Sequence, residues 1–289
     1  MTKISVIAEQ VRNEEDAFCF MQRVGIVHSF RYCSNGHMMC LCFKSRRWRC
    51  FRSGCEKEIG IRTGTWIAKS NLDFSVILQI TYFWAYEKLT VKFGENNLGV
   101  GHTTECDWTS FLREICMKSL TKKQKQIGGE GLTVEIDETL IAKRKSDVGR
   151  VLFHQWVFGG VCRETGEVFV VKVPDRKAKT LIPLITKYIR PGTIIMSDMW
   201  RPYSSIKKYG YKHLRVNHKK NFVDPKTNAH TQTIERCWRS LKERSKRQCG
   251  ISIELLDSYL AEFMWRARLK EKDPFEAIIH DIAHFWSWK

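Results

Sequence analysis

The sequence predicts a mixed α/β protein in which a strand-rich second half follows a cysteine-rich segment and a helical segment. Five segments have the alternating or apolar pattern of strands: 132–137, 151–161, 167–173, 193–198 and 212–216. The first three follow one another as a meander, and the last two alternate with helical patterns, which is typical of a mixed sheet. Five of the eleven cysteines fall between Cys33 and Cys55, ahead of the strands.

Charge and hydrophobicity narrow the class of protein. The 289 residues include 49 Lys and Arg against 31 Asp and Glu, a formal net charge of +18, and 43% are hydrophobic. A folded chain this basic is expected to bind a polyanion. The longest uncharged apolar run, 74–86, is shorter than the ~20 residues that cross a bilayer, and the first residues lack a signal-peptide pattern. We therefore expect no membrane partner and a reducing compartment, where cysteines bind metals more often than they form disulfides.

The N-terminal residues, 1–30, have apolar side chains at near-helical spacing and are predicted to be helical. The next segment, 31–66, is predicted to be a zinc ribbon with four ligands: Cys33, His37, Cys50 and Cys55. Each half of this set places two ligands around a glycine-containing turn, and two convergent pairs suit one tetrahedral Zn²⁺. The spacing leaves Cys40 or Cys42 open as a substitute for His37. Reduced cysteines in a small core are the alternative, but so short a segment has little else to stabilise it.

Residues 67–121 are predicted to be helical, with the outline of a helix-turn-helix. A strongly apolar helix is expected at 72–87, capped by Ser70-Asn71, and a second at 104–120, with a glycine-containing turn between them. Any small α-helical domain would show the same pattern, and the basic charge favours the DNA-binding interpretation.

A polar, glycine-rich linker is expected at 122–131, and the domain predicted at 132–289 carries three acids at positions suited to metal binding. Asp137 and Asp198 each end a predicted strand, and Glu235 lies at the start of a long helix. Converging carboxylates repel one another, and hard divalent cations such as Mg²⁺ relieve that repulsion. The alternative for each acid is an exposed cap or turn residue.

Basic and aromatic residues near these acids are the predicted DNA contacts. On the helix of Glu235, positions i+4, i+7 and i+11 share its face, which is either a solvated surface or a track for DNA phosphates. Trp200, after Asp198, suits stacking on a base as well as core packing. The predicted contacts are Lys143, Arg144, Lys145, Trp200, Arg201, Arg239, Lys242 and Lys246.

Several motifs follow one another in a characteristic order: the Cys-x-x-x-His segment and residues 61–66, 134–139, 195–203 and 230–242. This order resembles the transposases of the Merlin family of DNA transposons and their bacterial insertion-sequence relatives, and His-Thr-Gln-x-x-Glu is its most specific part. The resemblance implies an RNase H-like catalytic domain with a DDE triad of Asp137, Asp198 and Glu235, and the family's basic residue seven positions later matches Lys242. Some bacterial relatives carry Asn at the third acid, whereas this chain keeps Glu. Its Cys-x4-Cys pair is wider than that of the bacterial members.

The resemblance implies a cut-and-paste transposase. Such an enzyme would bind double-stranded DNA at terminal inverted repeats, cleave the ends and join the freed 3′ ends to target DNA. It would use two Mg²⁺ or Mn²⁺ ions at the triad and one structural Zn²⁺. A homodimer is expected because two ends must be held together, in the nucleus of a eukaryotic host or otherwise in the cytoplasm or nucleoid. Two alternatives remain open: an RNase H-like nuclease without strand transfer, and a domesticated, non-catalytic DNA-binding protein.

Overall fold

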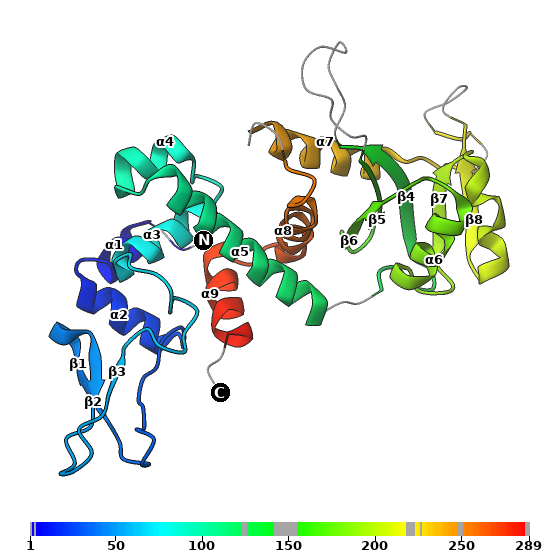
Figure 1. The fold of residues 1–289 in the computed structure, drawn as a ribbon. Coiled ribbons are helices and arrows are strands. Elements are labelled where there is room, and N and C mark those ends of the chain that lie inside the picture. Colours follow the sequence, from blue (N-terminus) through cyan, green and yellow to red (C-terminus); the bar gives the residue numbers. More distant parts are fainter. Residues whose placement is uncertain are drawn as a thin grey trace. The chain divides into compact units, whose positions relative to one another are not determined.

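The computed structural model describes residues 2, 4–122, 126–141, 155–217, 223–225, 227–247 and 251–286. The chain divides into two compact units: Met1–Ser119 with Glu271–Lys289, and Leu120–Lys270 (Figure 1). The sequence predicts one domain from residue 132 to 289, whereas the last segment, from Glu271 onward, groups with the first unit. None of the helices in the described ranges combines the length and the apolarity that a bilayer crossing needs.

The first unit combines helices with a small antiparallel sheet. Helices α1 (Ile4–Gln10) and α2 (Glu14–Arg23) precede strands β1 (Cys40–Cys42), β2 (Arg47–Arg49) and β3 (Glu58–Gly60). The central strand, β2, pairs with both β1 and β3. Strands β1 and β2 thus form an antiparallel hairpin, to which β3 adds a third strand. The remaining helical elements are α3 (Phe74–Ala85), α4 (Val91–Phe93), η2 (Gly94–Leu98), α5 (His102–Lys122), most of which lies in this unit, and α9 (Pro274–Phe285).

Two details of the helical segment differ from the sequence-based prediction. Helix α3 begins at Phe74 rather than at residue 72, because the backbone N–H groups of Phe74 and Ser75 each donate to the carboxylate of Glu14 at 2.9 Å. The helix is thus capped by a residue distant in sequence and not by Ser70-Asn71. The connection between α3 and α5 is also not a single turn, since α4 and η2 occupy it and Gly99, with φ 64°, ends them.

Helix α9 belongs to the first unit because Asp273 and an aromatic contact hold it there. The Asp273 carboxylate accepts the N–H groups of Phe275 and Glu276 at 3.0 and 3.1 Å, which caps the helix. It also accepts the Tyr86 hydroxyl, just after α3, at 2.7 Å. The ring of Phe275 packs against that of Tyr82, with 5.4 Å between centroids. These contacts join α9 to the end of α3.

A five-stranded mixed sheet forms the centre of the second unit. Its strands are β4 (Thr133–Leu140), β5 (Trp156–Cys162), β6 (Val168–Val173), β7 (Ile194–Asp198) and β8 (Lys212–Val216). The spatial order is β6-β5-β4-β7-β8. The first three strands form an antiparallel meander, and β7 and β8 add parallel to β4. This is the RNase H-like order, so the predicted fold class is confirmed.

Helices cover both faces of this sheet (Figure 1). Helix α6 (Ala178–Tyr188) and the 3₁₀ segment η3 (Arg201–Tyr209) pack on one face around buried residues such as Phe158 and Tyr203. Helices α7 (Gln232–Arg247) and α8 (Leu256–Leu269) pack on the other face through Ile234, Trp238 and Leu260. Because successive side chains of a strand point to opposite faces, alternate residues of β4 lie under α7.

Candidate active site and metal centre

Asp137 lies within β4, at the point where the neighbouring strand β7 diverges. Strand β4 pairs with β5 as far as Leu140, so Asp137 does not end the strand as the sequence predicts. Its pairing with β7 runs only from Thr133 to Glu135. The carboxylate therefore stands at a gap in the sheet while its backbone stays held by β5 on the other side.

The parallel register of β4 and β7 brings Asp137 level with Asp198. Glu135 is the partner of Met196, and two residues further along each strand lie the two aspartates. Paired residues of parallel strands point to the same face, and so do residues two apart. Both carboxylates therefore lie on the face that α7 covers. Asp198 is close enough to help raise the pKa of Asp137 by charge repulsion.

Glu235 lies in the first turn of α7, the helix that packs on the sheet face of the two aspartates. Its side chain is exposed, and its Oε1 accepts the hydroxyl of Thr231 at 3.1 Å. One turn later, the indole N–H of Trp238 donates to Oδ2 of Asp137 at 3.0 Å, which ties this part of α7 to β4. The oxygens of the three acids are not gathered within 4.8 Å of one another. In α7, Glu235 lies three residues, about one turn, before the Trp238 that contacts Asp137.

Gly159 makes room for the Trp238 ring that donates to Asp137. It is the partner of Asp137 on β5, and a Cβ atom there would lie 2.6 Å from the Trp238 ring and 2.8 Å from the Phe169 carbonyl oxygen. No side chain fits between the sheet and the indole. The glycine therefore lets Trp238 lie flat enough on the sheet to reach the Asp137 carboxylate.

A buried acid that the sequence analysis did not single out fixes the start of α7. Glu135, fully buried on β4, accepts the N–H groups of Thr233 and Ile234 at 2.8 and 2.9 Å. It also pairs with Arg163 at 2.5 Å. A carboxylate suits the first turn of a helix, where the N–H groups lack partners and the dipole is positive. Its only sequence signal is its position two residues before Asp137, on the same strand face.

Burial makes Asp137 a weak acid. Desolvation, reinforced by the nearby Glu138 carboxylate, raises the pKa of Asp137 to about 7, and the hydrogen bond from Trp238 opposes this only in part. A carboxyl group in this state binds a proton near neutral pH unless a cation replaces the proton. Carboxylate oxygens are the ligands that Mg²⁺ and Mn²⁺ prefer, so the donor set of Asp137, Asp198 and Glu235 fits a divalent cation.

Trp200 is placed on the surface beside Asp198, not in the core. The residue is 40% exposed, and its backbone N–H donates to Oδ1 of Asp198 at 2.9 Å. The guanidinium of Arg176 lies 4.4 Å from the Trp200 ring and 4.5 Å from the Trp156 ring, as a cation between two aromatic groups. Arg176 also pairs at 3.2 Å with the buried carboxylate of Glu138. The contacts of Arg176 with Trp156, Trp200 and Glu138 hold the turn after β7, and the sequence did not predict them.

The predicted basic contacts are only partly described. Arg239 and Lys246 are exposed on α7 and Lys242 is half-buried, while Arg201 is exposed directly after Trp200. The other three predicted contacts, Lys143, Arg144 and Lys145, lie outside the described residues.

A cysteine-histidine cluster in the first unit brings together the four predicted metal ligands, Cys33, His37, Cys50 and Cys55. Their ligand atoms all lie within 4.8 Å of one another. The Cys33 and Cys55 sulfurs are 3.6 Å apart, and the Cys50 sulfur is 3.6 Å from Nδ1 of His37. Ligand pairs at this separation match a tetrahedral ion with Zn–S bonds of about 2.3 Å. Cys40 is exposed on β1 and, like Cys42, lies outside the cluster, so His37 completes the set.

The strand order defines the class of the second unit, an RNase H-like domain of the nucleic-acid-processing enzymes. Residues 126–268 match the ISXO2-like transposase domain. The chain therefore carries a transposase domain of the DDE type related to those of insertion sequences. The finer assignment to the Merlin family stays a prediction.

Individual proteins that resemble this chain share less than a third of their aligned residues with it. Over 100 residues, 35% of this chain and 80% of the relative, the chain is 29% identical to an uncharacterized transposase-like protein of Haemophilus influenzae. The catalytic core domain of BIV integrase aligns over 50% of this chain and 91% of its own, at 15% identity and a TM-score of 0.33. A pre-cleavage Mos1 transpososome aligns over 72% and 78%, at 10% identity and a TM-score of 0.26. At such scores the fold assignment rests on the strand order.

Proposed function

We propose that this transposase cleaves DNA at the ends of its element and joins the freed 3′ ends to target DNA, with Asp137, Asp198 and Glu235 as the catalytic triad. The observation that carries the proposal is the parallel register of β4 and β7, which sets the two aspartates level beneath α7. The match of residues 126–268 to a transposase domain supports it independently.

Two Mg²⁺ or Mn²⁺ ions are the proposed cofactors. When bound, they would supply activation of the attacking oxygen and stabilisation of the leaving 3′ oxygen. The protein holds the carboxylates in position. Asp137 and Asp198 stand on rigid strands, and the Trp238 indole fixes the orientation of the Asp137 carboxylate. Because burial raises the pKa of Asp137 to about 7, a cation that bound there would displace a proton from part of the molecules at neutral pH.

Double-stranded DNA is the proposed partner. Arg239, Lys242 and Lys246 recur on the side of α7 that carries Glu235, and the net charge of +18 favours a polyanion. Trp200, exposed next to Asp198 and braced by Arg176, offers a ring on which a base near the cut can stack. Two element ends must be held together, so we propose that a homodimer acts. A single structural Zn²⁺ in the cysteine-histidine cluster completes the proposed assembly.

The triad is tested by neutral isosteres. Asp137→Asn, Asp198→Asn and Glu235→Gln should each abolish cleavage of a duplex that carries the terminal repeat, in Mg²⁺ or Mn²⁺, and leave its gel shift intact. Asp257→Asn is the matched control, because Asp257 is an exposed acid on α8 and its loss changes the charge equally. Near-normal cleavage by one triad variant would remove that residue from the triad.

Joining is tested separately from cutting. Wild-type protein should insert a pre-cleaved 3′ end into a supercoiled plasmid, in a reaction that all three triad variants lose. Cleavage without joining would instead define an RNase H-like nuclease. A protein that binds DNA and neither cuts nor joins it would be a non-catalytic DNA-binding protein.

A further inference from the structure

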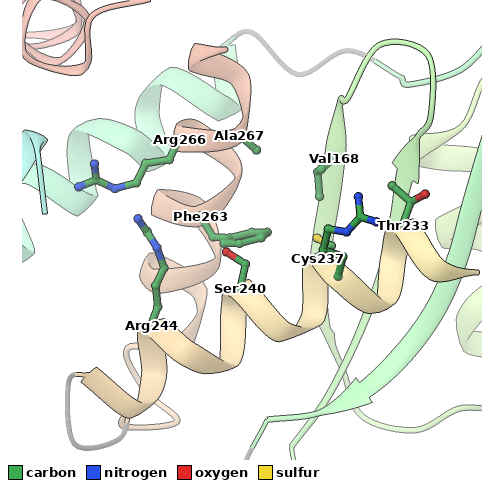
Figure 2. Close-up of a pocket in the computed structure, with 9 residues that line it drawn as sticks. Val168, Thr233, Cys237, Ser240, Arg244, Phe263, Arg266 and Ala267 are labelled. Carbon is green, nitrogen blue, oxygen red and sulfur yellow. The ribbon is translucent and has the colours of Figure 1, made fainter. Parts of the chain in front are cut away.

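A groove with a volume of about 320 Å³ lies between α7 and α8 (Figure 2). Ser240 and Arg244 on α7 face Phe263 and Arg266 on α8 across it, and Arg236 also lines it. The residues that line the groove thus include three arginines and no acid.

This groove and the Glu235 side of α7 are different surfaces. Each residue advances a helix by roughly 100°, so Arg236 and Arg244 lie about 100° and 180° around the axis from Glu235. Lys242 lies within about 20° of Glu235 on the same scale. Trp238, buried against the sheet, lies about 60° from Glu235 in the opposite sense, and the groove is centred near Ser240 and Arg244, about 140° and 180° from Glu235. A ligand in the groove would therefore contact α7 on the side away from the candidate triad.

Two of the arginines share one buried carboxylate. Arg266 and Arg244 approach the same oxygen, Oε1 of Glu262, at 2.8 and 3.4 Å. Their side chains are 12% and 17% exposed, so the charges are partly shielded from water yet open to the groove. Arg236 is exposed, and within the described ranges it makes no ion pair with an acid. The groove thus has three guanidinium groups around it against the one carboxylate of Glu262, an excess of positive charge.

We infer that this groove binds the phosphodiester backbone of DNA, as a second contact region separate from the Glu235 side. Guanidinium groups match phosphate oxygens with two parallel hydrogen bonds, and the Ser240 hydroxyl adds a neutral donor. The Phe263 ring lowers the local dielectric and so strengthens the attraction. The inference rests on the proposed function, because a reaction that joins an end to a target requires one domain to hold two segments of DNA.

The salt dependence of DNA binding tests the inference. Full-length Arg236→Gln should bind a duplex several-fold more weakly, and the slope of log K against log salt should fall by about 0.9 for each lost phosphate contact. Arg190→Gln is the matched control: Arg190 is an exposed arginine that precedes β7, outside the groove, and its loss removes the same charge. That variant should keep the wild-type slope.

A double variant tests whether the two sides of α7 are separate. Lys242→Gln should lower the slope by a similar amount, and Arg236→Gln with Lys242→Gln should lower it by about twice 0.9 if each residue contacts its own phosphate. If the slope of the double variant is no lower than that of either single variant, the two residues do not contact separate phosphates and the inference is overturned. Glu262→Gln, which removes the carboxylate that competes for Arg244 and Arg266, should bind DNA more tightly than wild type.

Failure of the groove inference can be told apart from failure of the proposed function, because these experiments measure DNA binding and not cleavage. Suppose that wild-type protein binds DNA, but that the slope for Arg236→Gln equals the wild-type slope or falls no further than the slope for Arg190→Gln. The groove is then not a DNA site, while the proposal for the triad is unaffected. If wild-type protein binds no DNA at all, the proposed function fails with it. Should Glu262→Gln not fold, the Arg236→Gln comparison decides alone.

Discussion

Replacing Glu135 by alanine tests how strongly the central strand holds the helix that carries Glu235. The carboxylate is fully buried and accepts three donors: the N–H groups of Thr233 and Ile234 at 2.8 and 2.9 Å, and Arg163 at 2.5 Å. Alanine would leave the first turn of α7 without its acceptor and Arg163 without its partner. We expect α7 to loosen at its start, where Glu235 lies.

The magnitude follows from these contacts. Loss of a helix N-cap costs about 1–2 kcal/mol, and breaking a buried ion pair costs about 3–5 kcal/mol. Because the side chain of Arg163 is 22% exposed and can regain water, the lower part of that range applies. The two losses remove the same carboxylate and do not add in full, so we expect Glu135→Ala to lose about 3–4 kcal/mol. For a unit of the size of Leu120–Lys270 this lowers the Tm by roughly 6–16 °C.

Calorimetry of the full chain measures this loss as the shift of the transition that Glu135→Ala moves. Glu135→Gln keeps an oxygen for the helix N–H groups and loses only the charge, so it should lose about 1–2 kcal/mol. Glu254→Gln, the same change at an exposed position, should stay within about 0.5 kcal/mol of wild type. A loss below about 1 kcal/mol in Glu135→Ala would refute the argument that this carboxylate anchors α7.

Three further predictions concern the same sites. In a chelating buffer, the contribution of Asp137 to stability should fall as pH rises from about 4 to 7, because folded Asp137, with a pKa of about 7, keeps a proton that the unfolded carboxyl has released. His213, whose pKa burial lowers to about 4, acts in the opposite sense, so the measured quantity is the difference between two proteins: in thermal melts Asp137→Asn should gain stability relative to wild type as pH rises from about 4 to 7. Gly159→Ala should lose about 1–3 kcal/mol in urea unfolding and also slow cleavage, because its Cβ would displace Trp238. Metal analysis should find one zinc per chain, lost in Cys50→Ser together with folding of the ribbon but kept in Cys40→Ser; zinc retained in Cys50→Ser would contradict the assigned ligands.

Elements that depend on short stretches of sequence were predictable. The strand patterns of β4 to β8 give the mixed α/β class because the alternation of side chains is a local property. The pairs Cys33 with His37 and Cys50 with Cys55 were predictable for the same reason, since each surrounds one turn. The acids at 137, 198 and 235 stood out by their places at strand and helix ends and by the family resemblance.

The tertiary structure alone decided how these pieces meet. The register that sets Asp137 beside Asp198 joins strands about sixty residues apart, and no local pattern specifies it. The caps of α3 and α7 come from Glu14 and Glu135, each distant in sequence from the helix it caps. Likewise His37, rather than Cys40, faces the other three ligands only once the ribbon has folded. Periodicity and turn spacing act between near neighbours, whereas register, long-range caps and the closure of a site depend on contacts that only the folded chain makes.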